Sequence, residues 1–545
     1  MTHGGCLRNV PTRLSTDYAD DGVFFYASIK TADIEVYGLL SAAALGLVFA
    51  AATSLIQRYR QTPSTGPSLP PTIMLEATLA ADRYSSSIIS SVIHFTLRRL
   101  HALFSIHHEI VHDVFHIEKV FFKQNEAFDI HPISTSMLRR IFRCNFIGIV
   151  RDECIEVVDG FMKIVARDFL NAEVSSLIIF SENTDLQNPW EQLAYTKVLR
   201  LDPTYPGHVV EADLESLLRV LSFHISIPLV YGHDYLDRNP LALWDWDCFG
   251  GQTALLALGV PTWVPIPSFR RRIVARDRLV DSISSVYRRT RQYRNGEAVD
   301  YGADMPDVSE TALDRYQVFD RHGLPAENIG HIEFSLLWAQ NQNTQQLLFW
   351  YIFYIYYVPG LLDSLRQELA SSGVLSISAD DPPRITRLHI GVLGKQCPLL
   401  KSTFLESFWV TEESIMFRRV TEKLTLDDGK DQYQLRLGSW LSDSTALTRH
   451  HSWIYPRPLE FLPDRFVEGS TASYKTLRPW GLGLTMCKGR TFTEKKVLAV
   501  AASMIALWDI EQAVGEWQHP SFRTGATILD PASKLRVRIK RRTLD

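Results

Sequence analysis

The sequence predicts a mainly α-helical protein with small β-sheets, and three observations support that class. Apolar residues recur with helical spacing over four long segments, 264–293, 331–358, 400–410 and 489–511. Residues 385–394 and 413–440 are β-like or irregular, with turn signals at "DDPP" (380–383) and "DDGK" (427–430). The 545 residues are 46% hydrophobic and 22% charged, which is ordinary globular composition and long enough for a large core.

The first distinct element is an uncharged segment near the N-terminus. Residues 36–56 read "VYGLLSAAALGLVFAAATSLI", which as a helix spans roughly 31 Å, enough to cross a bilayer core. Asp33 and Glu35 precede it and Arg58 and Arg60 follow it, so the positive-inside rule places everything downstream in the cytosol. A buried alanine-rich helix is the alternative. A cleaved signal peptide is disfavoured because the segment starts far from the N-terminus.

These features predict four regions along the chain. A short lumenal segment (1–33) precedes a transmembrane anchor (34–57), a stiff proline-rich hinge containing "QTPSTGPSLPPT" (58–72) and one large catalytic or binding unit (73–545). We expect a single-pass membrane protein whose bulk faces the cytosol.

Charge and cysteine content exclude several protein classes. The net charge is −4, so nothing indicates a nucleic-acid partner. The six cysteines are scattered without a CxxC pair, which predicts neither a disulfide framework nor a zinc ribbon.

Two short motifs suggest other functions. His108-Glu109-x-x-His112 matches a zinc-hydrolase pattern that requires both histidines on one helical face. No third ligand stands at the expected spacing, and "EIVHD" also fits a short strand that ends before a helix. Gly481-Leu-Gly483 fails the dinucleotide fingerprint because position 486 is methionine.

The apolar run "LLFWYIFYIYYV" (347–358) is too short to span a membrane and predicts a buried helix. Asparagine and glutamine are frequent just before it, and we expect that part of the helix to line a cavity.

Near the C-terminus, Cys487 stands between a glycine-rich lead-in and a helical pattern. A thiolate there suits the axial position of a haem iron if water is excluded. Glycines before it allow a tight backbone close to a flat macrocycle, and the following helix directs its positive end at the sulfur. A buried structural cysteine is the alternative.

At these residues the sequence resembles the cytochrome P450 superfamily. The haem-binding loop of that family corresponds to Trp480, Gly483, Thr485, Cys487 and Gly489. "YPRPLEFLPDRF" (455–466) is similar to the family's meander, "LLKSTFLESFWV" (399–410) to its Glu-x-x-Arg helix, and "LLWAQNQNTQQLLFW" (336–350) to its oxygen-binding helix. The resemblance covers 210–545 well and 73–210 poorly. "WAxxxNT" and "WGxGxxMCKGR" are most similar to fungal members related to the sterol 7α- and 12α-hydroxylase and prostacyclin synthase branch.

The resemblance implies a cytochrome P450 fold with one haem-binding domain, and it implies roles for individual residues. Cys487 ligates the iron of haem b (iron protoporphyrin IX), held in a loop that includes Trp480, Gly483 and Gly489. Thr344 donates a hydrogen bond during oxygen activation, and Asn343 takes part in the proton relay where most of the superfamily has an acid.

Two positions depart from the pattern. Trp409 stands where the family has the arginine that pairs with Glu406, which leaves that carboxylate dependent on Arg465 alone. Thr485 replaces the basic residue that usually binds a haem propionate, and Arg418 or Arg419 is expected to compensate.

We therefore expect a haem-thiolate monooxygenase of the endoplasmic reticulum membrane that inserts one atom of O2 into a lipophilic sterol, terpenoid or polyketide in secondary metabolism. Electrons derived from NADPH would come from a separate NADPH–cytochrome P450 reductase, because no flavin domain fits within this length. The alternatives are a haem-binding relative with impaired catalysis, a reductase-independent peroxide isomerase or dehydratase of the same fold, and a membrane-tethered zinc hydrolase using His108 and His112.

Overall fold

A computed structural model of the chain divides into two units, Met1–Arg83 and Tyr84–Asp545. The structure describes residues 108–111, 127–129, 131–144, 151–170, 199–200, 209–232, 234–250, 253–257, 260, 262–299, 308–380, 383–427, 432–444, 455–458, 460–468, 477–523 and 527–543, all within the second unit. The predicted lumenal segment, transmembrane anchor and hinge lie outside the described residues.

Helices make up most of the described chain, in agreement with the predicted class. They are α5 (His131–Arg140), α6 (Arg151–Leu170), α8 (Leu214–Tyr231), α9 (Asp234–Arg238), α10 (Ala242–Gly250), α11 (Ala254–Ala257), α12 (Pro267–Arg294), α13 (Glu310–Arg321), α14 (Ala326–Tyr357), α15 (Leu361–Ser372), α16 (Ile390–Gln396), α17 (Pro398–Thr411) and α20 (Arg490–Leu507).

The strands form small sheets, as predicted. One sheet has the order β1-β10-β7-β2, from His108–Val111, Trp440–Ser444, Ile415–Val420 and Phe128–Asp129, with β1 parallel to β10 and the other pairs antiparallel. A second has the order β11-β14-β4-β3, from Trp508–Gln512, Arg536–Arg541, Val210–Asp213 and Leu199–Arg200. Three two-stranded pairs are β5 (Leu375–Ile377) with β6 (Ile385–Leu388), β8 (Leu424–Asp427) with β9 (Gln432–Leu435), and β12 (Phe522–Arg523) with β13 (Asp530–Pro531).

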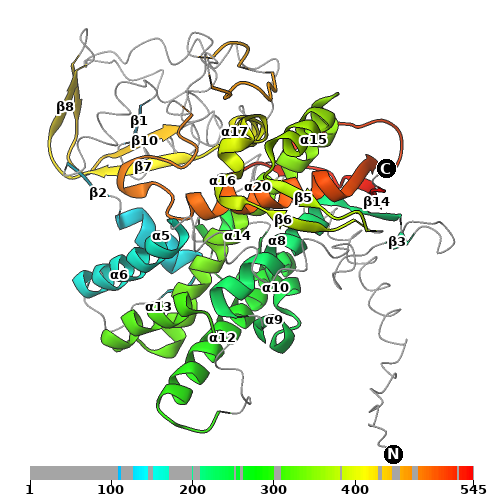
Figure 1. Ribbon diagram of the computed structural model, residues 1–545. Helices are drawn as coiled ribbons and strands as arrows, with labels where there is room; N and C mark the ends of the chain where they lie inside the picture. The colour runs from blue at the N-terminus through cyan, green and yellow to red at the C-terminus, as the bar shows by residue number, and fades with distance from the viewer. Residues whose placement is uncertain are drawn as a thin grey trace, which may run out of the picture. The chain divides into compact units, whose positions relative to one another are not determined.

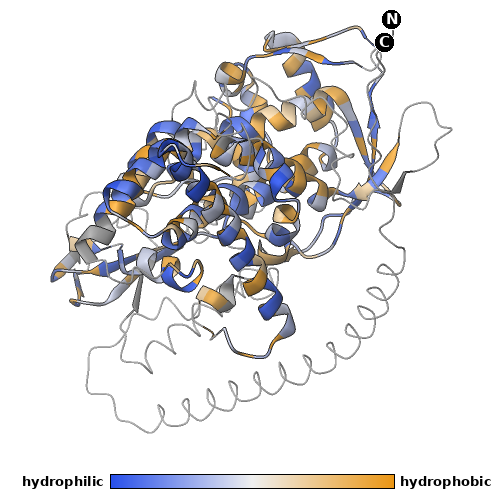
Figure 2. Cartoon of the chain, turned by 90° about the horizontal axis from the view of Figure 1, so that it is seen from below, coloured by the Kyte–Doolittle hydropathy of each residue, from blue (hydrophilic) through white to orange (hydrophobic). Residues whose placement is uncertain are grey.

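The central element is α14, which packs against α8 and α12 as well as against α17 and α20 (Figure 1). Every residue from Leu347 to Ile355 is at most 2% exposed. The prediction that this apolar run forms a buried helix is therefore confirmed for these residues. Apolar side chains surround this stretch on all faces, which is typical of a helix inside the core of a large protein. Other helices carry hydrophobic and hydrophilic residues on different faces (Figure 2).

Three predicted boundaries are wrong. The helix predicted over 489–511 ends at Leu507, because Trp508 is extended (φ −131°, ψ 145°) and starts strand β11 beside β14. The β-like stretch 385–394 ends at Leu388 and continues as α16, whose Ile390 and Leu393 are buried. Helix α14 begins at Ala326, five residues before the predicted start, where Pro325 supplies the extended N-cap.

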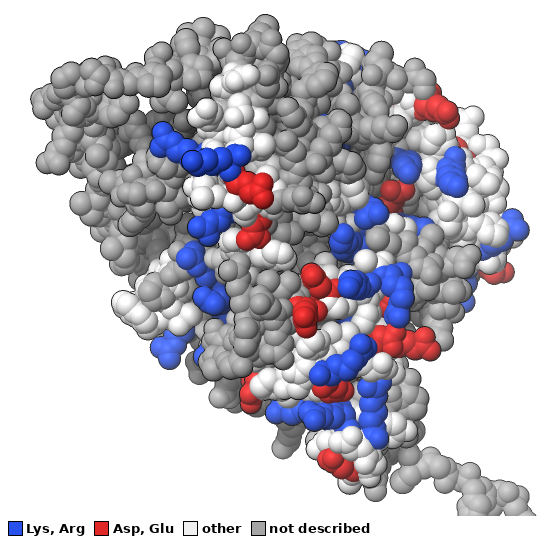
Figure 3. Space-filling model, turned by 90° about the vertical axis from the view of Figure 1, so that its left-hand side faces the viewer, with Lys and Arg blue, Asp and Glu red and all other residues white. Residues whose placement is uncertain are grey.

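Among the described residues, no single helix has the length and apolar character to cross a bilayer; α14 and α15, which meet at a bend of 102°, reach that length and composition only together. On the face drawn in Figure 3, basic and acidic side chains of the described residues are interspersed rather than separated by sign.

Candidate functional site

The cysteine-containing loop is folded by its own backbone. Gly481 and Gly483 adopt left-handed φ values of 75° and 59°, which side chains other than glycine rarely tolerate. A 3-10 turn follows at Gly483–Thr485, and the Cys487 N–H donates to the Trp480 carbonyl at 2.8 Å. The glycines therefore let the chain reverse direction and present Cys487 at the tip of a closed loop.

The Cys487 side chain is exposed and lines a pocket. Protein atoms around the sulfur raise the pKa of the thiol by desolvation, whereas the Gly489 N–H and the charges of Arg490 and Lys488 lower it. Helix α20 begins at Arg490, so its positive N-terminal end lies beside the sulfur. The Gly489 N–H, the two cationic side chains and the helix end stabilise the negative charge of a thiolate when the Cys487 thiol has lost its proton.

The pocket has a volume of about 310 Å³ and is walled by α5, α14, α17, β7 with the turn before it, the cysteine loop, the start of α20 and the residues before β13. Its apolar lining includes Ala339, Leu347, Phe408, Ile415, Met416, Phe417, Pro479, Trp480 and Ile528. Its polar lining includes Ser134, Asn343, Thr344, Glu412, Ser414, Arg418, Thr485, Cys487, Thr493 and Thr527.

Thr344 and Asn343 reach this pocket from the middle of α14. Thr344 is 3% exposed, and within the described chain its hydroxyl makes no hydrogen bond back to the preceding turn. The hydroxyls of Thr403 and Ser407 on α17 do so, at 2.8 and 2.9 Å. The Thr344 hydroxyl is thus available to a bound molecule.

Arg418 and Arg419 occupy successive positions on β7 and differ completely in surroundings. Arg418 is buried, lines the pocket and donates to the Thr485 hydroxyl at 2.7 Å. Burial lowers the pKa of Arg418 to about 10. Arg419 is exposed and does not line the pocket, because successive side chains of a strand point to opposite faces. Of the two predicted candidates, only Arg418 lies at the site.

Glu406 on α17 is fully buried and accepts hydrogen bonds from two sides. Arg465 binds it through Nε and Nη2 at 2.8 and 3.2 Å, and the Leu462 N–H donates at 2.8 Å. The predicted dependence on Arg465 alone is therefore wrong, since the chain before Arg465 folds back and contributes an amide. Arg465 also donates to the carbonyls of Pro456, Arg457 and Glu460.

Trp409 takes a specific place in this network. Its ring lies 5.1 Å from the Arg465 guanidinium carbon, and its Nε1 donates to the Pro458 carbonyl at 3.2 Å. An aromatic face attracts a cation, more strongly when both are out of water. Trp409 thus contacts the arginine that pairs with Glu406 and ties α17 to the 455–466 segment.

The residues around the pocket fit a haem. The loop presents a sulfur beside amide and cationic groups, and Arg418 brings a buried guanidinium suited to a carboxylate. At Gly489, where φ is −89°, an added Cβ would meet only the Cys487 sulfur, at 3.9 Å, among the residues that the structure describes. The described surroundings leave room for a side chain there, whereas a flat group lying against the sulfur would require glycine.

No family model matches the chain. The structure resembles that of retinoic acid bound cyanobacterial CYP120A1 with a TM-score of 0.59 and 19% identity, over 79% of this chain and 89% of that one. A cytochrome P450 monooxygenase of Penicillium oxalicum, poxD, is 25% identical over 54% of this chain and 57% of its own length. Cytochrome P450 7B1 of Mus musculus is 27% identical over 38% of this chain and 43% of its own length.

These relatives and this fold support the predicted resemblance to the cytochrome P450 superfamily. The human 7-alpha-hydroxycholest-4-en-3-one 12-alpha-hydroxylase is also similar to this chain, at 25% identity over 45% of this chain and 51% of the relative. The chain spans about half the length of these curated relatives. The predicted resemblance to this superfamily is confirmed.

The residues of the zinc-hydrolase pattern do not form the helix that such a site requires. His108 begins a strand, β1, that pairs with β10, and a strand does not place positions 108 and 112 as a helix would. His112 lies outside the described residues. Among the residues that the structure describes, no three His, Cys, Asp or Glu side chains could hold a metal ion.

Several pocket residues have no sequence motif. Glu412 and Ser414 reach the pocket from the turn after α17, and Thr527 and Ile528 reach it from the C-terminal region. Backbone hydrogen bonds join the two segments, from Glu413 N to Thr527 O and from Leu529 N to Thr411 O. Sequence reasoning missed this wall because pairing between residues more than 100 positions apart leaves no local pattern.

Proposed function

We propose that this protein is a haem-thiolate monooxygenase of the cytochrome P450 superfamily that inserts one atom of O2 into a lipophilic substrate. The observation that carries the proposal is the Cys487 loop, which closes on itself and exposes the sulfur to a pocket lined by Thr344 and Arg418. Bound haem b would supply the oxygen-activating chemistry. The protein supplies the thiolate, an apolar pocket and groups that hold protons.

The proposal assigns a role to each residue predicted at the haem site. Cys487 binds the iron, and Trp480, Gly483 and Gly489 shape the loop around it. Arg418, with Thr485 beside it, binds a haem carboxylate. On the opposite wall, the free Thr344 hydroxyl and the Asn343 amide orient water and pass protons into the pocket.

The Glu406–Arg465 pair acts at a distance from the pocket. It joins α17 to the segment before the cysteine loop, and the Phe408 ring of the same helix contacts Trp480 at 4.8 Å. The pair therefore fixes the wall against which the loop rests, which makes Glu406 and Arg465 positioning residues.

Partner and location follow from the same proposal. A single-pass anchor over 34–57 would hold the protein on the endoplasmic reticulum membrane, where an NADPH–cytochrome P450 reductase supplies electrons. The substrate would be a sterol, terpenoid or polyketide of secondary metabolism, and the apolar side chains among the pocket lining support a lipophilic molecule.

The deciding experiment is a carbon monoxide difference spectrum of the reduced, haem-loaded protein. We expect the absorption shift of a thiolate-ligated haem in the wild type and its loss in Cys487→Ser. Cys397→Ser is the matched control, because Cys397 is a buried cysteine between α16 and α17 that does not line the pocket. A wild type that binds haem without the thiolate signature would overturn the proposal. NADPH-dependent turnover with the reductase then separates a monooxygenase from an isomerase or an impaired relative.

A second measurement tests Arg418. Arg418→Leu is expected to retain haem at least about tenfold less tightly, because one charge-assisted hydrogen bond contributes about 1.5–3 kcal/mol. Arg419→Leu should leave haem retention unchanged, since Arg419 is exposed away from the pocket. Equal haem loss in both variants would contradict the assignment.

A further inference from the structure

A tyrosine–histidine pair joins the C-terminal half of α14 to the segment between β11 and β12. The Tyr354 hydroxyl lies 2.8 Å from His519 Nε2, and His519 Nδ1 lies 2.7 Å from the Pro520 carbonyl oxygen. Because a carbonyl oxygen only accepts hydrogen bonds, Nδ1 carries a hydrogen and is the donor to Pro520. In a neutral imidazole Nε2 is then an acceptor, so the Tyr354 hydroxyl donates to it. The geometry therefore pairs a phenol with a base.

Two other buried tyrosines of α14 donate to backbone carbonyls instead. Tyr351 donates to the Leu400 carbonyl at 2.8 Å, and Tyr356 donates to the Trp508 carbonyl at 2.9 Å. A carbonyl holds a phenol in place but does not take its proton, whereas a neutral imidazole does. Of these three tyrosines, Tyr354 has the partner that can act as a base.

Burial keeps the pair in the protonation states that this hydrogen bond requires. Tyr354 is 2% exposed, and desolvation, together with Glu406 and Tyr357 nearby, raises the pKa of its hydroxyl. Desolvation lowers the pKa of His519, although the hydrogen bond to the Pro520 carbonyl opposes this. At neutral pH the phenol is therefore protonated and the imidazole is able to accept a proton.

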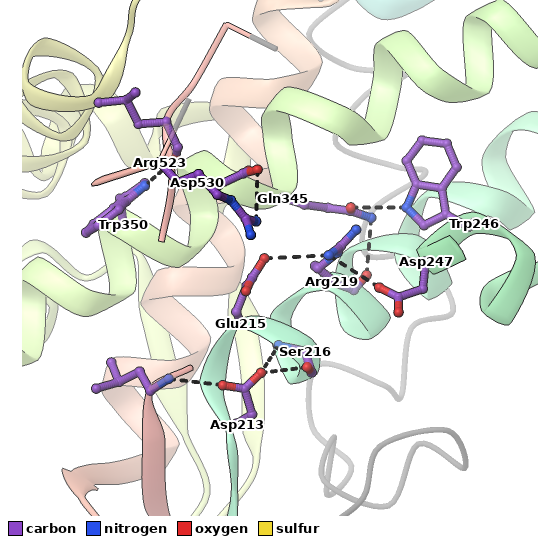
Figure 4. A network of polar contacts seen from close by, with 12 residues as sticks. Asp213, Glu215, Ser216, Arg219, Trp246, Asp247, Gln345, Trp350, Arg523 and Asp530 are labelled. Atoms are coloured by element: carbon purple, nitrogen blue, oxygen red, sulfur yellow. Dashed lines mark hydrogen bonds and ion pairs between the residues drawn. The ribbon is translucent and has the colours of Figure 1, made fainter. Parts of the chain in front are cut away.

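Aromatic side chains hold the His519 ring against α14. The ring stacks on Trp350 with centroids 5.4 Å apart, and it lies 5.1 Å from the Phe522 ring of β12. Trp350 Nε1 also donates to the Leu529 carbonyl at 2.6 Å, and Figure 4 shows this indole beside Asp530 at the C-terminal strands. His519 as a whole is exposed, so a proton on its ring can exchange with water.

Packed aromatic rings connect Tyr354 to the pocket. Trp480 lines the pocket and lies 6.4 Å from the Phe404 ring, which lies 5.8 Å from the Tyr351 ring. Tyr351 and Tyr354 are neighbours one turn apart on α14. Leu347 also lines the pocket, and Tyr354 lies about 10 Å further along the helix axis. An electron can cross such a packed path, whereas a proton needs an acceptor within hydrogen-bond reach.

We propose that Tyr354 is a redox-active residue that returns an electron to an oxidised haem site while His519 accepts its proton. The role rests on the proposed function, because the electron acceptor is the bound haem. Oxidising equivalents that do not reach a substrate would be removed by this route before they damage the Cys487 loop.

The step balances in atoms and electrons. Hydrogen peroxide takes two electrons from the haem site and two protons from solvent, and it yields two molecules of water. Tyr354 replaces one of these electrons: its O–H bond breaks, an N–H bond forms at His519 Nε2, and a tyrosyl radical remains. One electron from the reductase restores the phenol as His519 gives the proton back.

Electron paramagnetic resonance of the haem-loaded protein, frozen after mixing with hydrogen peroxide, tests the role of Tyr354. The wild type should give a tyrosyl radical signal, and Tyr354→Phe should lower it several-fold, because the phenol that loses the electron is gone. Tyr356→Phe is the matched control on the same helix and should leave the signal unchanged, since Tyr356 donates to a carbonyl. A wild type without the signal, or equal signals in the two variants, would overturn the proposal.

The role of His519 is tested with a substitution that keeps a hydrogen-bond acceptor. Glutamine can accept a hydrogen bond from Tyr354 but does not take up a proton at neutral pH. His519→Gln should therefore form the radical several-fold more slowly and with a larger solvent isotope effect. His389→Gln, at an exposed position before α16, should behave as the wild type. An unchanged rate in His519→Gln would show that His519 is not the proton acceptor.

The tautomer of His519 can be measured without any oxidant. Nitrogen-15 NMR of histidine-labelled protein, assigned by the resonances missing in His519→Gln, should show a hydrogen on Nδ1 and none on Nε2. A hydrogen on Nε2 would contradict the proposal, because Tyr354 would then be the acceptor. Absence of the thiolate signature would instead refute the proposed function. Peroxide oxidises protein-bound haem with other axial ligands as well, so the radical measurement decides the role of Tyr354 in either case.

Discussion

Two fully buried charges, Glu406 on α17 and Lys496 on α20, are satisfied in opposite ways. Glu406 has a guanidinium and a backbone N–H as partners. Lys496 Nζ has no carboxylate among its described contacts and donates to the Ser222 carbonyl at 2.9 Å, to the Ser222 hydroxyl at 2.8 Å and to the Ser226 hydroxyl. Both side chains are 0% exposed.

Desolvation moves both groups toward neutrality from opposite directions. It raises the pKa of Glu406 to about 7, although Arg465 and the Leu462 N–H oppose it, and it lowers the pKa of Lys496 to about 7. The guanidinium and the N–H beside Glu406 offset only part of the cost of desolvating its carboxylate. The serine oxygens beside Lys496 offset a smaller part of the cost of desolvating its ammonium group. The comparison shows that burial dominates both sites and that the ion pair specifies geometry.

The two sites give opposite dependence of stability on pH. Glu406 has a folded pKa above its model value of 4.5, so its contribution to stability is present below pH 4.5 and is lost as pH rises to about 7. Lys496 has a folded pKa below its model value of 10.5, so its contribution is present above pH 10.5 and is lost as pH falls to about 7. Together they produce a minimum near neutral pH.

The largest expected effect comes from breaking the ion pair. Arg465→Leu leaves Glu406 buried without a countercharge and should lower the free energy of unfolding by about 3–5 kcal/mol, measured by urea denaturation. The control is Arg457→Leu, whose exposed pair with Glu460 at 3.3 Å should contribute less than about 1 kcal/mol. Similar losses in both variants would show that Glu406 is not held by Arg465.

Replacing the unpaired cation should have the opposite sign. Lys496→Met removes a buried charge and leaves Ser226 donating to the Ser222 carbonyl at 2.7 Å. We expect stability at pH 7 to rise by at least about 1–4 kcal/mol, the range for replacing a whole buried ion pair by apolar residues, because Lys496 has no described countercharge to lose. The increase should vanish as pH approaches 10.5. Lys534→Met, at an exposed position, should show neither effect; a destabilised Lys496→Met variant would mean that the charge itself is required.

The smallest expected effect concerns Trp409. Trp409→Phe keeps an aromatic face over Arg465 but loses the bond to the Pro458 carbonyl, so it should cost about 1–2 kcal/mol. Trp409→Leu should cost more, because it also removes the face that Arg465 contacts. Equal costs for the two variants would show that the ring does not interact with the guanidinium.

The sequence allowed the fold class and the site's main residues to be predicted, because both depend on local patterns. Helical spacing predicted α12, α14 and α17 to within a few residues at most ends. The cysteine loop was recognisable because its glycines and cysteine are close together along the chain. The error after Leu507 arose because the apolar pattern continues where the backbone pairs with β14 instead.

Long-range contacts could not be predicted in the same way. Which of Arg418 and Arg419 faces the pocket depends on the pleat and register of β7, which β10 and β2 set. The effect of Trp409 depends on the 455–466 segment folding back onto α17, and the C-terminal part of the pocket wall depends on pairing across more than 100 residues.

By itself, the sequence determined that the chain is mainly helical, that Cys487 lies on a glycine-shaped loop before a helix, and that this loop resembles a haem-binding one. Those properties depend on spacing within a few turns of backbone. Only the tertiary structure decided that Arg418 accompanies Thr485 and that Trp409 contacts Arg465. Desolvation and charge pairing depend on distances in space, and those distances are set by the packing of elements that are remote in the chain.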